Sequence, residues 1–409
     1  MTGESWVPVP DGSPFGLANL PYGVFTGGGS NRPRVGVAIG DHVLDLPAAL
    51  AAAQPGAATS LVEAFGQPSL NEFLATGPDT WAAARERVTD LLTVERFRTE
   101  VEPALLPADQ VRLLLPFRVA DYVDFYCSEQ HATNAGRMFR PAGEPLQPNW
   151  KALPVGYHGR AGTIVVSGSP VVRPCGQRRP AGAEAPTYGP SLRLDFEAEV
   201  GFVVGVPSRL GDRVPTAGWR DHVFGVVLVN DWSARDIQFW ESAPLGPFLA
   251  KSFATSVSPW VVPLAALEPA FVDPPEQRPE PLPYLRPAGP SLALDLEVRL
   301  NGQVLARPPF ATGMYWTPAQ QLAHLTVNGA SLRTGDLYAS GTVSGSDPDQ
   351  LGSLLELSWN GSNPVRLPDG GTRTFLEDGD TVSIAGWATG ADGARIGLGE
   401  VSGTIQPAR

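Results

Sequence analysis

The chain has 409 residues, of which 43% are hydrophobic, and a formal net charge of −12. This length and apolar content allow a large core and two or three domains. The acidic balance, with a pI near 4.9, argues against nucleic acid or an anionic membrane as a partner, because both attract a basic surface.

Two further features indicate the compartment. Cys127 and Cys175 are the only cysteines, which argues against a disulfide framework or a cysteine-based zinc site. The N-terminal residues lack a secretory signal pattern, and the longest apolar runs are far too short to span a bilayer. We therefore expect a cytoplasmic protein.

Residues 1–118 are predicted to form a small N-terminal β domain with a helical connection. Alternating apolar and polar residues at 34–46 are typical of strands, whereas residues 61–75 and 80–101 have helical spacing. The following segment at 103–117, PALLPADQVRLLLPF, is interpreted as a linker.

Residues 119–409 are predicted to form a larger domain that is mainly β with few helices. Short β-branched runs alternate here with Gly, Pro, Asn and Asp, a pattern that favours strands. These runs include TIVVSG, PVVRP, AEVGFVVGV, FGVVLVND, LALDLEVRLNGQVLA, LELSWNG and DTVSIAGWA. The Pro-rich segment at 273–290 has strand patterns on both sides, so we interpret it as a surface excursion within the domain.

Several carboxylates stand out by their sequence context. Glu197 and Glu199 are two residues apart in a strand-like run, so their side chains point to the same face. If that face is buried, both need a compensating cation; otherwise they lie on a solvated sheet edge. Asp231 ends an apolar strand, and Asp124 lies in the polar stretch at 121–160. Four oxygen donors of this kind suit Mg²⁺ or Ca²⁺.

The same polar stretch holds candidates for chemistry. Ser128 is a plausible N-cap that places His131 in the first turn of a helix, where it becomes a candidate general base. Cys127 raises a cysteine-nucleophile alternative, although a buried thiol is the commoner role. Lys251 has an apolar surround and could be a surface lysine. The Gly-rich segment at 340–348 lacks the P-loop lysine, so no nucleotide site is indicated.

Taken together, the segments DYVDFYCSEQHATNAGRMFR, LDFEAEVGF, VLVNDWSARDIQFWE and GDLYASGTVSGSDP resemble the fumarylacetoacetate hydrolase family. The resemblance runs in order from Asp121 to the C-terminus and is weaker before it. It implies a small SH3-like N-terminal barrel followed by a larger β-roll domain of mixed sheets, assembled as a homodimer.

The resemblance also implies roles for individual residues. A divalent cation, Ca²⁺ or Mg²⁺, would be held by Asp124, Glu197, Glu199 and Asp231, with Lys251 and Thr255 at a second magnesium-associated position. The catalytic residues would be His131 as the base, Glu356, which orients it, and Arg235, Gln238 and Lys251, which stabilise negative charge. Substrate would contact Tyr126, Arg140, Tyr157, Gln238 and Thr342.

The implied activity is hydrolysis of the carbon–carbon bond of fumarylacetoacetate to fumarate and acetoacetate, the last step of tyrosine and phenylalanine catabolism. The alternatives are a related acylpyruvate or diketo-acid hydrolase or decarboxylase, or a non-catalytic dicarboxylate-binding homologue. Two positions depart from the family pattern: Ser242 replaces a common Tyr, and Ala254 replaces a Gly. Ser242 bears on substrate preference more than on reaction type.

Overall fold

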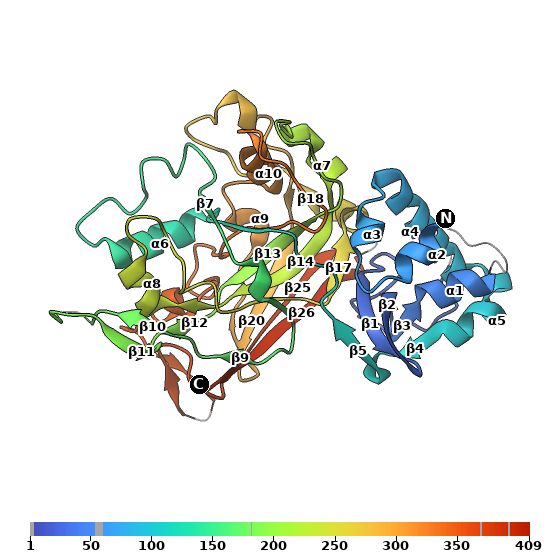
Figure 1. Cartoon of the computed structure of the whole chain (residues 1–409), viewed down its shortest axis with the longest axis horizontal. Coiled ribbons are helices and arrows are strands. Elements are labelled where there is room, and N and C mark those ends of the chain that lie inside the picture. Colours follow the sequence, from blue (N-terminus) through green and yellow to red (C-terminus); the bar gives the residue numbers. More distant parts are fainter. Residues whose placement is uncertain (1–3, 54–59, 181, 369, 392) are drawn as a thin grey trace.

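The computed structural model describes residues 4–53, 60–180, 182–368, 370–391 and 393–409. A smaller N-terminal part, drawn in blue, packs against one end of a larger C-terminal part (Figure 1). Sheets dominate the larger part, whereas the smaller part combines a sheet with helices that cover it. The predicted sheet-rich α+β class is therefore confirmed, and residues 1–118 and 119–409 remain our proposed domains.

The N-terminal part is a small curled sheet covered by helices. Its strands are β1 (Tyr22–Gly27), β2 (Ser30–Ile39), β3 (His42–Asp45), β4 (Leu105–Pro107) and β5 (Val111–Leu114). They lie in the order β4-β3-β2-β1, and β5 pairs with β1. The helices are α1 (Leu46–Ala53), α2 (Ser60–Phe65), α3 (Asn71–Leu74), α4 (Pro78–Thr93) and α5 (Arg98–Val101).

The predicted linker at 103–117 is wrong, because it contains β4 and β5. Leu105 and Leu106 pair with β3, and residues 111–114 pair with β1. Runs of three or four residues carry too little periodicity to identify, and distant strands supply their hydrogen bonds. Each of the two predicted helical segments, 61–75 and 80–101, coincides with two α-helices in the structure, and the second also contains a 3-10 helix at Glu95–Phe97.

The main sheet continues from β1 into the C-terminal part in the order β1-β17-β14-β13-β22-β6-β7. Its C-terminal strands are β6 (Tyr122–Phe125), β7 (Gly156–His158), β8 (Ile164–Val166), β13 (Ala198–Val204), β14 (Val223–Asp231), β16 (Thr255–Val257), β17 (Trp260–Pro263) and β22 (Leu337–Ala339). Strand β16 pairs with both β14 and β8 off this path. The sheet is continuous across the two parts.

A second sheet has the order β21-β20-β25-β26-β9. Its strands are β9 (Val171–Val172), β20 (Leu294–Leu300), β21 (Gln303–Ala306), β25 (Thr381–Thr389) and β26 (Arg395–Gln406). Four two-stranded pairs complete the β structure: β10 (Cys175–Arg178) with β11 (Thr187–Pro190), β12 (Leu194–Asp195) with β15 (Ser233–Ala234), β18 (Phe271–Val272) with β19 (Ser291–Leu292), and β23 (Val365–Arg366) with β24 (Thr372–Arg373).

The C-terminal helices are short: α6 (Glu129–Phe139), α7 (Trp219–His222), α8 (Arg235–Glu241), α9 (Phe310–Gly313), α10 (Pro318–Thr326) and α11 (Leu354–Leu357). The predicted strand LELSWNG is wrong, because its first residues lie in α11. Ser353 caps this helix by accepting a hydrogen bond from the backbone N–H of Glu356. A four-residue helix is too short for its spacing to be distinguished from a strand.

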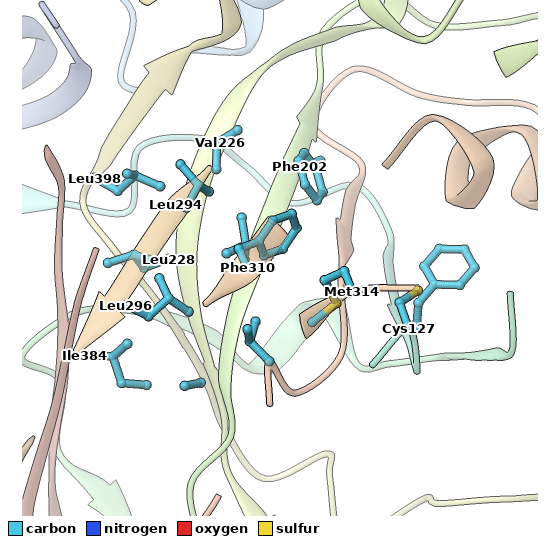
Figure 2. Close-up of a cluster of buried hydrophobic side chains, with 14 of the residues drawn as sticks. Cys127, Phe202, Val226, Leu228, Leu294, Leu296, Phe310, Met314, Ile384 and Leu398 are labelled. Carbon is cyan, nitrogen blue, oxygen red and sulfur yellow. The ribbon is translucent and has the colours of Figure 1, made fainter. Parts of the chain in front are cut away.

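Apolar side chains fill the space between the two sheets of the C-terminal part. Figure 2 shows this cluster, which includes Phe202, Val226, Leu228, Leu294, Leu296, Ile384 and Leu398. All of these side chains are fully buried. Close packing makes such a core a rigid support for the ends of β6, β13 and β14.

The Pro-rich segment is a surface excursion, as predicted. It leaves the core after β18 and returns at β19, and these two strands pair in antiparallel fashion.

In the described part of the chain, no helix combines the length and apolar character needed to cross a bilayer.

Candidate active site

Four buried carboxylates converge at neighbouring strand ends. Asp124 comes from β6, Glu199 from β13 and Asp231 from the end of β14, while Glu197 immediately precedes β13. One ligand atom from each residue lies within 4.8 Å of the others. Each residue is at most 4% exposed, so the alternative of a solvated sheet edge is wrong.

The carboxylate cluster carries more negative charge than its surroundings compensate. Burial, followed by neighbouring carboxylates, raises the pKa of Asp124 and Glu199 well above the ordinary range. Among the described residues, no group hydrogen-bonds Asp124 Oδ1 or either carboxylate oxygen of Glu199. Buried ionised oxygens require a cation or donors. The all-oxygen donor set and these unpartnered atoms fit a hard divalent cation, so the cluster can bind a divalent metal.

Lys251 lies beside the cluster instead of on the surface. Its Nζ is 2.8 Å from Asp231 Oδ2 and also contacts Glu197 Oε2. Burial opposes the charged form, but Asp231 and Glu197 outweigh it and raise the pKa of Lys251. Burial alone would raise the pKa of Glu197, yet Lys251 and Arg235 together lower it. Lys251 therefore stays protonated and holds Glu197 ionised.

Strand register places two further groups against the cluster. Tyr157 lies opposite Asp124 in the β6–β7 pair, and Thr255 lies opposite Asp231 in the β14–β16 pair. Tyr157 Oη donates to Asp231 Oδ2 at 3.0 Å, and Thr255 Oγ1 donates to Asp231 Oδ1 at 3.1 Å. These hydrogen bonds fix the orientation of the Asp231 carboxylate.

His131 and Glu356 form a buried pair beside the cluster. Ser128 caps α6 as predicted and accepts from the His131 backbone N–H. His131 Nδ1 lies 2.7 Å from Glu356 Oε2. Burial opposes ionisation of Glu356, but His131 and the donors around it lower its pKa. An ionised carboxylate only accepts, so Nδ1 carries the hydrogen, and in the neutral ring the lone pair is on Nε2.

The Glu356 carboxylate has a complete set of donors. Oε2 also accepts from Ser344 and Ser353 at 2.8 and 2.9 Å, and Oε1 accepts from Asn134 at 2.9 Å. With four donors in place, the carboxylate has one orientation. The ring of His131 is held in turn, with Nε2 4.0 Å from Glu197 Oε1.

Arg235 begins α8 and is held by three contacts. Its Nε donates to Asp195 Oδ2 at 2.9 Å, and Nη1 donates to Gln238 Oε1 at 3.1 Å. Nη2 is 2.8 Å from Glu197 Oε1, an ion pair without the angle of a hydrogen bond. Nη2 therefore ties Arg235 to the carboxylate cluster.

One cavity of about 550 Å³ opens onto these groups. All five residues predicted to contact substrate line it: Tyr126, Arg140, Tyr157, Gln238 and Thr342. Gly341 has φ of +76°, and a Cβ there would clash with the carbonyl of Phe125, so glycine lets Thr342 approach the end of β6. Thr342 Oγ1 is buried and has no protein partner among the described residues.

The remaining predicted residues fall into two groups. The first group lines the cavity: Asp124, His131, Glu197, Glu199, Arg235 and Lys251. The second group lies behind the cavity wall: Asp231, Thr255 and Glu356.

Cys127 is buried and does not line the cavity. Burial, followed by Asp124, raises the pKa of its thiol well above the ordinary range. The geometry therefore does not favour the cysteine-nucleophile alternative.

Sequence reasoning missed two parts of the site. The first is an apolar wall at the cavity mouth, formed by Phe139, Phe239, Leu245 and Pro247. The second is Asp195, which has the same two-residue spacing from Glu197 that Glu197 has from Glu199. This alternation was the available signal for Asp195, whereas no sequence pattern marked the apolar wall.

Ser242 and Ala254 are the two departures from the family pattern. Ser242 lines the cavity and caps the C-terminal end of α8, where its Oγ donates to the backbone carbonyl of Gln238 at 2.6 Å. Ala254 is nearly buried and packs in the core. The hydroxyl of Ser242 is thus engaged by its own helix.

Comparisons with known proteins agree with this architecture. The profile described as Fumarylacetoacetase N-terminal matches residues 18–116, and that described as Fumarylacetoacetate (FAA) hydrolase C-terminal matches residues 120–406. The chain is 48% identical to the fumarylacetoacetase of Homo sapiens, covering 99% of both proteins. It is 45% identical to that of Arabidopsis thaliana, covering 99% of this chain and 98% of the relative.

The fold is also found among solved structures. The fumarylacetoacetate hydrolase from the psychrophile Exiguobacterium antarcticum aligns with a TM-score of 0.54 and 19% identity, covering 95% of this chain and 100% of that one. The structural likeness supports the fold, and the family profiles and full-length relatives establish the membership: the chain belongs to the fumarylacetoacetase family.

Proposed function

We propose that the protein is a metal-dependent hydrolase that cleaves the carbon–carbon bond of fumarylacetoacetate to give fumarate and acetoacetate, the last step of tyrosine and phenylalanine catabolism. The observation that carries this proposal is that one cavity meets both the carboxylate cluster and the His131–Glu356 pair. The full-length relatives that bear the name fumarylacetoacetase support the substrate.

Asp124, Glu197, Glu199 and Asp231 would hold the cation, Mg²⁺ or Ca²⁺, with Lys251 and Thr255 beside it. When bound, such an ion polarises carbonyl oxygens of a 1,3-dicarbonyl. Asp124 Oδ1 and both carboxylate oxygens of Glu199 have no hydrogen-bond partner among the described residues, so they are the proposed ligand atoms.

His131 is the proposed base. Its Nε2 takes a proton from water in the cavity, while Glu356 keeps the hydrogen on Nδ1 and stabilises the imidazolium that forms. The water oxygen adds to the substrate carbonyl, the carbon–carbon bond breaks, and acetoacetate leaves as a carbanion. The proton then returns from His131 to that carbon.

A carbanion leaves readily only if its charge spreads onto oxygen as an enolate. Arg235, Gln238 and Lys251 lie in the cavity wall and are the proposed donors to this developing charge. Donors fixed in advance in a buried site contribute several kcal/mol to such a step. The contacts of Arg235 with Asp195 and Gln238 provide this fixation.

The substrate contacts are proposed from the cavity lining. Arg140 offers a cation to a terminal carboxylate, while Tyr126, Tyr157, Gln238 and Thr342 offer polar groups along the wall. Phe139 and Phe239 would pack against the carbon chain. Because Ser242 bonds to its own helix, it does not replace a phenol in this role.

The test is loss of fumarylacetoacetate absorbance with purified protein, before chelation, after chelation, and after adding back Mg²⁺ or Ca²⁺. Turnover that disappears on chelation and returns with metal supports substrate and cofactor together. Turnover of shorter acylpyruvates alone would favour the related hydrolase instead.

We also propose that the protein is a cytoplasmic homodimer. Light scattering tests the oligomeric state, and cell fractionation tests the compartment.

A further inference from the structure

Asp195 is a fully buried carboxylate that lies outside the carboxylate cluster. It ends β12 and pairs with Ser233 of β15, immediately before α8. Oδ2 accepts from Arg235 Nε at 2.9 Å. Asp195 therefore fixes the residue that begins α8.

The same carboxylate holds the start of α11. Oδ1 accepts from the backbone N–H of Leu354 at 2.7 Å, and Oδ2 accepts from that of Leu355 at 3.0 Å. The first N–H groups of a helix have no partner within the helix, so an external acceptor is needed. Glu356 is the next residue in this helix. Asp195 thus fixes the backbone that carries the partner of His131.

We propose that Asp195 is a positioning residue that couples the two working parts of the site, the Arg235 guanidinium and the His131–Glu356 pair. This inference rests on the proposed function. Arg235 has many rotamers and lies beside a cluster of excess negative charge. With Asp195 on one side and Gln238 on the other, the guanidinium is fixed in the wall of the cavity and against Glu197.

Asp195→Asn is the informative substitution, because it preserves shape but replaces an acceptor oxygen by an NH₂ group. In place of Oδ2 the NH₂ group faces Arg235 Nε and the Leu355 N–H, and in place of Oδ1 it faces the Leu354 N–H; all three are donors. At least one attachment to α11 is lost whichever way the amide turns.

Asp380→Asn is the matched control. Asp380 is also buried and accepts hydrogen bonds from an arginine, Arg373, and from the backbone N–H of Glu377. It lies at the start of β25 and does not line the cavity. The control therefore has the same chemical change and the same kind of structural cost.

The experiment measures kcat, KM and metal affinity for the metal-loaded, full-length proteins. We expect Asp195→Asn to lower kcat at least about tenfold, a size typical of supporting residues. KM and metal affinity should stay within about threefold, and Asp380→Asn should retain kcat. An Asp195→Asn enzyme with kcat within twofold of the unsubstituted protein, or an equal loss in the control, would overturn the inference.

A milder change covers the case in which Asp195→Asn does not fold. Replacing Leu354 by its α-hydroxy analogue converts one N–H into an ester oxygen and keeps every side chain. We expect a fall in kcat without a matching rise in KM; unchanged kcat would overturn the inference.

Failure of the proposed function can be distinguished from failure of the positioning role of Asp195. An unsubstituted protein without turnover refutes the substrate, and amide hydrogen exchange then tests Asp195 alone. Exchange at Leu354 or Leu355 should accelerate at least about tenfold in Asp195→Asn or, in the ester protein, at Leu355, relative to the unsubstituted protein. Unchanged exchange would contradict the positioning role.

Discussion

His131 Nδ1 and Glu356 Oε2 lie 2.7 Å apart, although 225 residues separate them in the chain. Helix α6 supplies the imidazole and α11 the carboxylate, and both side chains are buried. The pairing turns Nε2 of the ring toward the carboxylate cluster.

Glu356→Gln should lower kcat about 10²–10³-fold, because a neutral amide neither fixes the tautomer of His131 nor stabilises its charged form. Metal affinity should change little. Steady-state kinetics and calorimetric metal titration measure the two effects. Glu129→Gln is the control, since Glu129 lies in α6 and pairs with Lys151 on the surface. Near-normal kcat in Glu356→Gln would remove the pair from the mechanism.

Glu199→Gln should stabilise the metal-free protein and weaken metal binding. Both carboxylate oxygens of Glu199 are buried without a partner, and neighbouring carboxylates repel its charge. Removing that charge should stabilise the chelated protein by more than about 1 kcal/mol at neutral pH, because a buried charge without a partner costs several kcal/mol more than a neutral amide. Urea unfolding with and without chelator measures this, and a less stable metal-free variant would contradict it.

Thr342→Val should impair substrate binding without destabilising the fold. Thr342 Oγ1 is buried and makes no protein hydrogen bond among the described residues, so valine removes only a contact to a ligand. We expect kcat/KM to fall about fivefold, the value of a typical hydrogen bond. Thr326→Val is the control: its Oγ1 accepts from the Val214 N–H, so stability should fall while kcat/KM stays unchanged. The opposite pattern would exclude a substrate contact at Thr342.

Asp336 should make stability depend on pH. Burial is the main cause that raises its pKa from 3.8 to about 6. The folded state therefore holds this proton more tightly than the unfolded state, so this contribution to stability is full below pH 3.8 and is lost as pH rises toward 6. Urea unfolding of the metal-bound protein between pH 4 and 7 should show this loss, and Asp336→Asn should abolish it. An identical pH dependence in the variant would assign the effect to other groups.

Local sequence patterns determined the parts of the protein that depend on neighbours in the chain. Short apolar runs marked β13 and β14, and Ser128 marked the start of α6 and the place of His131. Glu197 and Glu199 were identified because two acids on one face of an apolar strand need a compensating cation if that face is buried. The segments that match the fumarylacetoacetate hydrolase family supplied the remaining residues, and the structure brings them around one cavity.

Only the tertiary structure decided the features whose partners are distant in the chain. Strands β4 and β5 exist because β3 and β1 offer them hydrogen bonds, and α11 forms where Ser353 and Asp195 satisfy its N-terminal N–H groups. Alternation with Glu197 and Glu199 marked the position of Asp195 but not its role, which depends on Arg235, 40 residues later in the chain, and on Leu354, 159 residues later. A sequence specifies side chains and short-range spacing, whereas burial and long-range contact determine which carboxylates bind a cation and which hold an arginine in place.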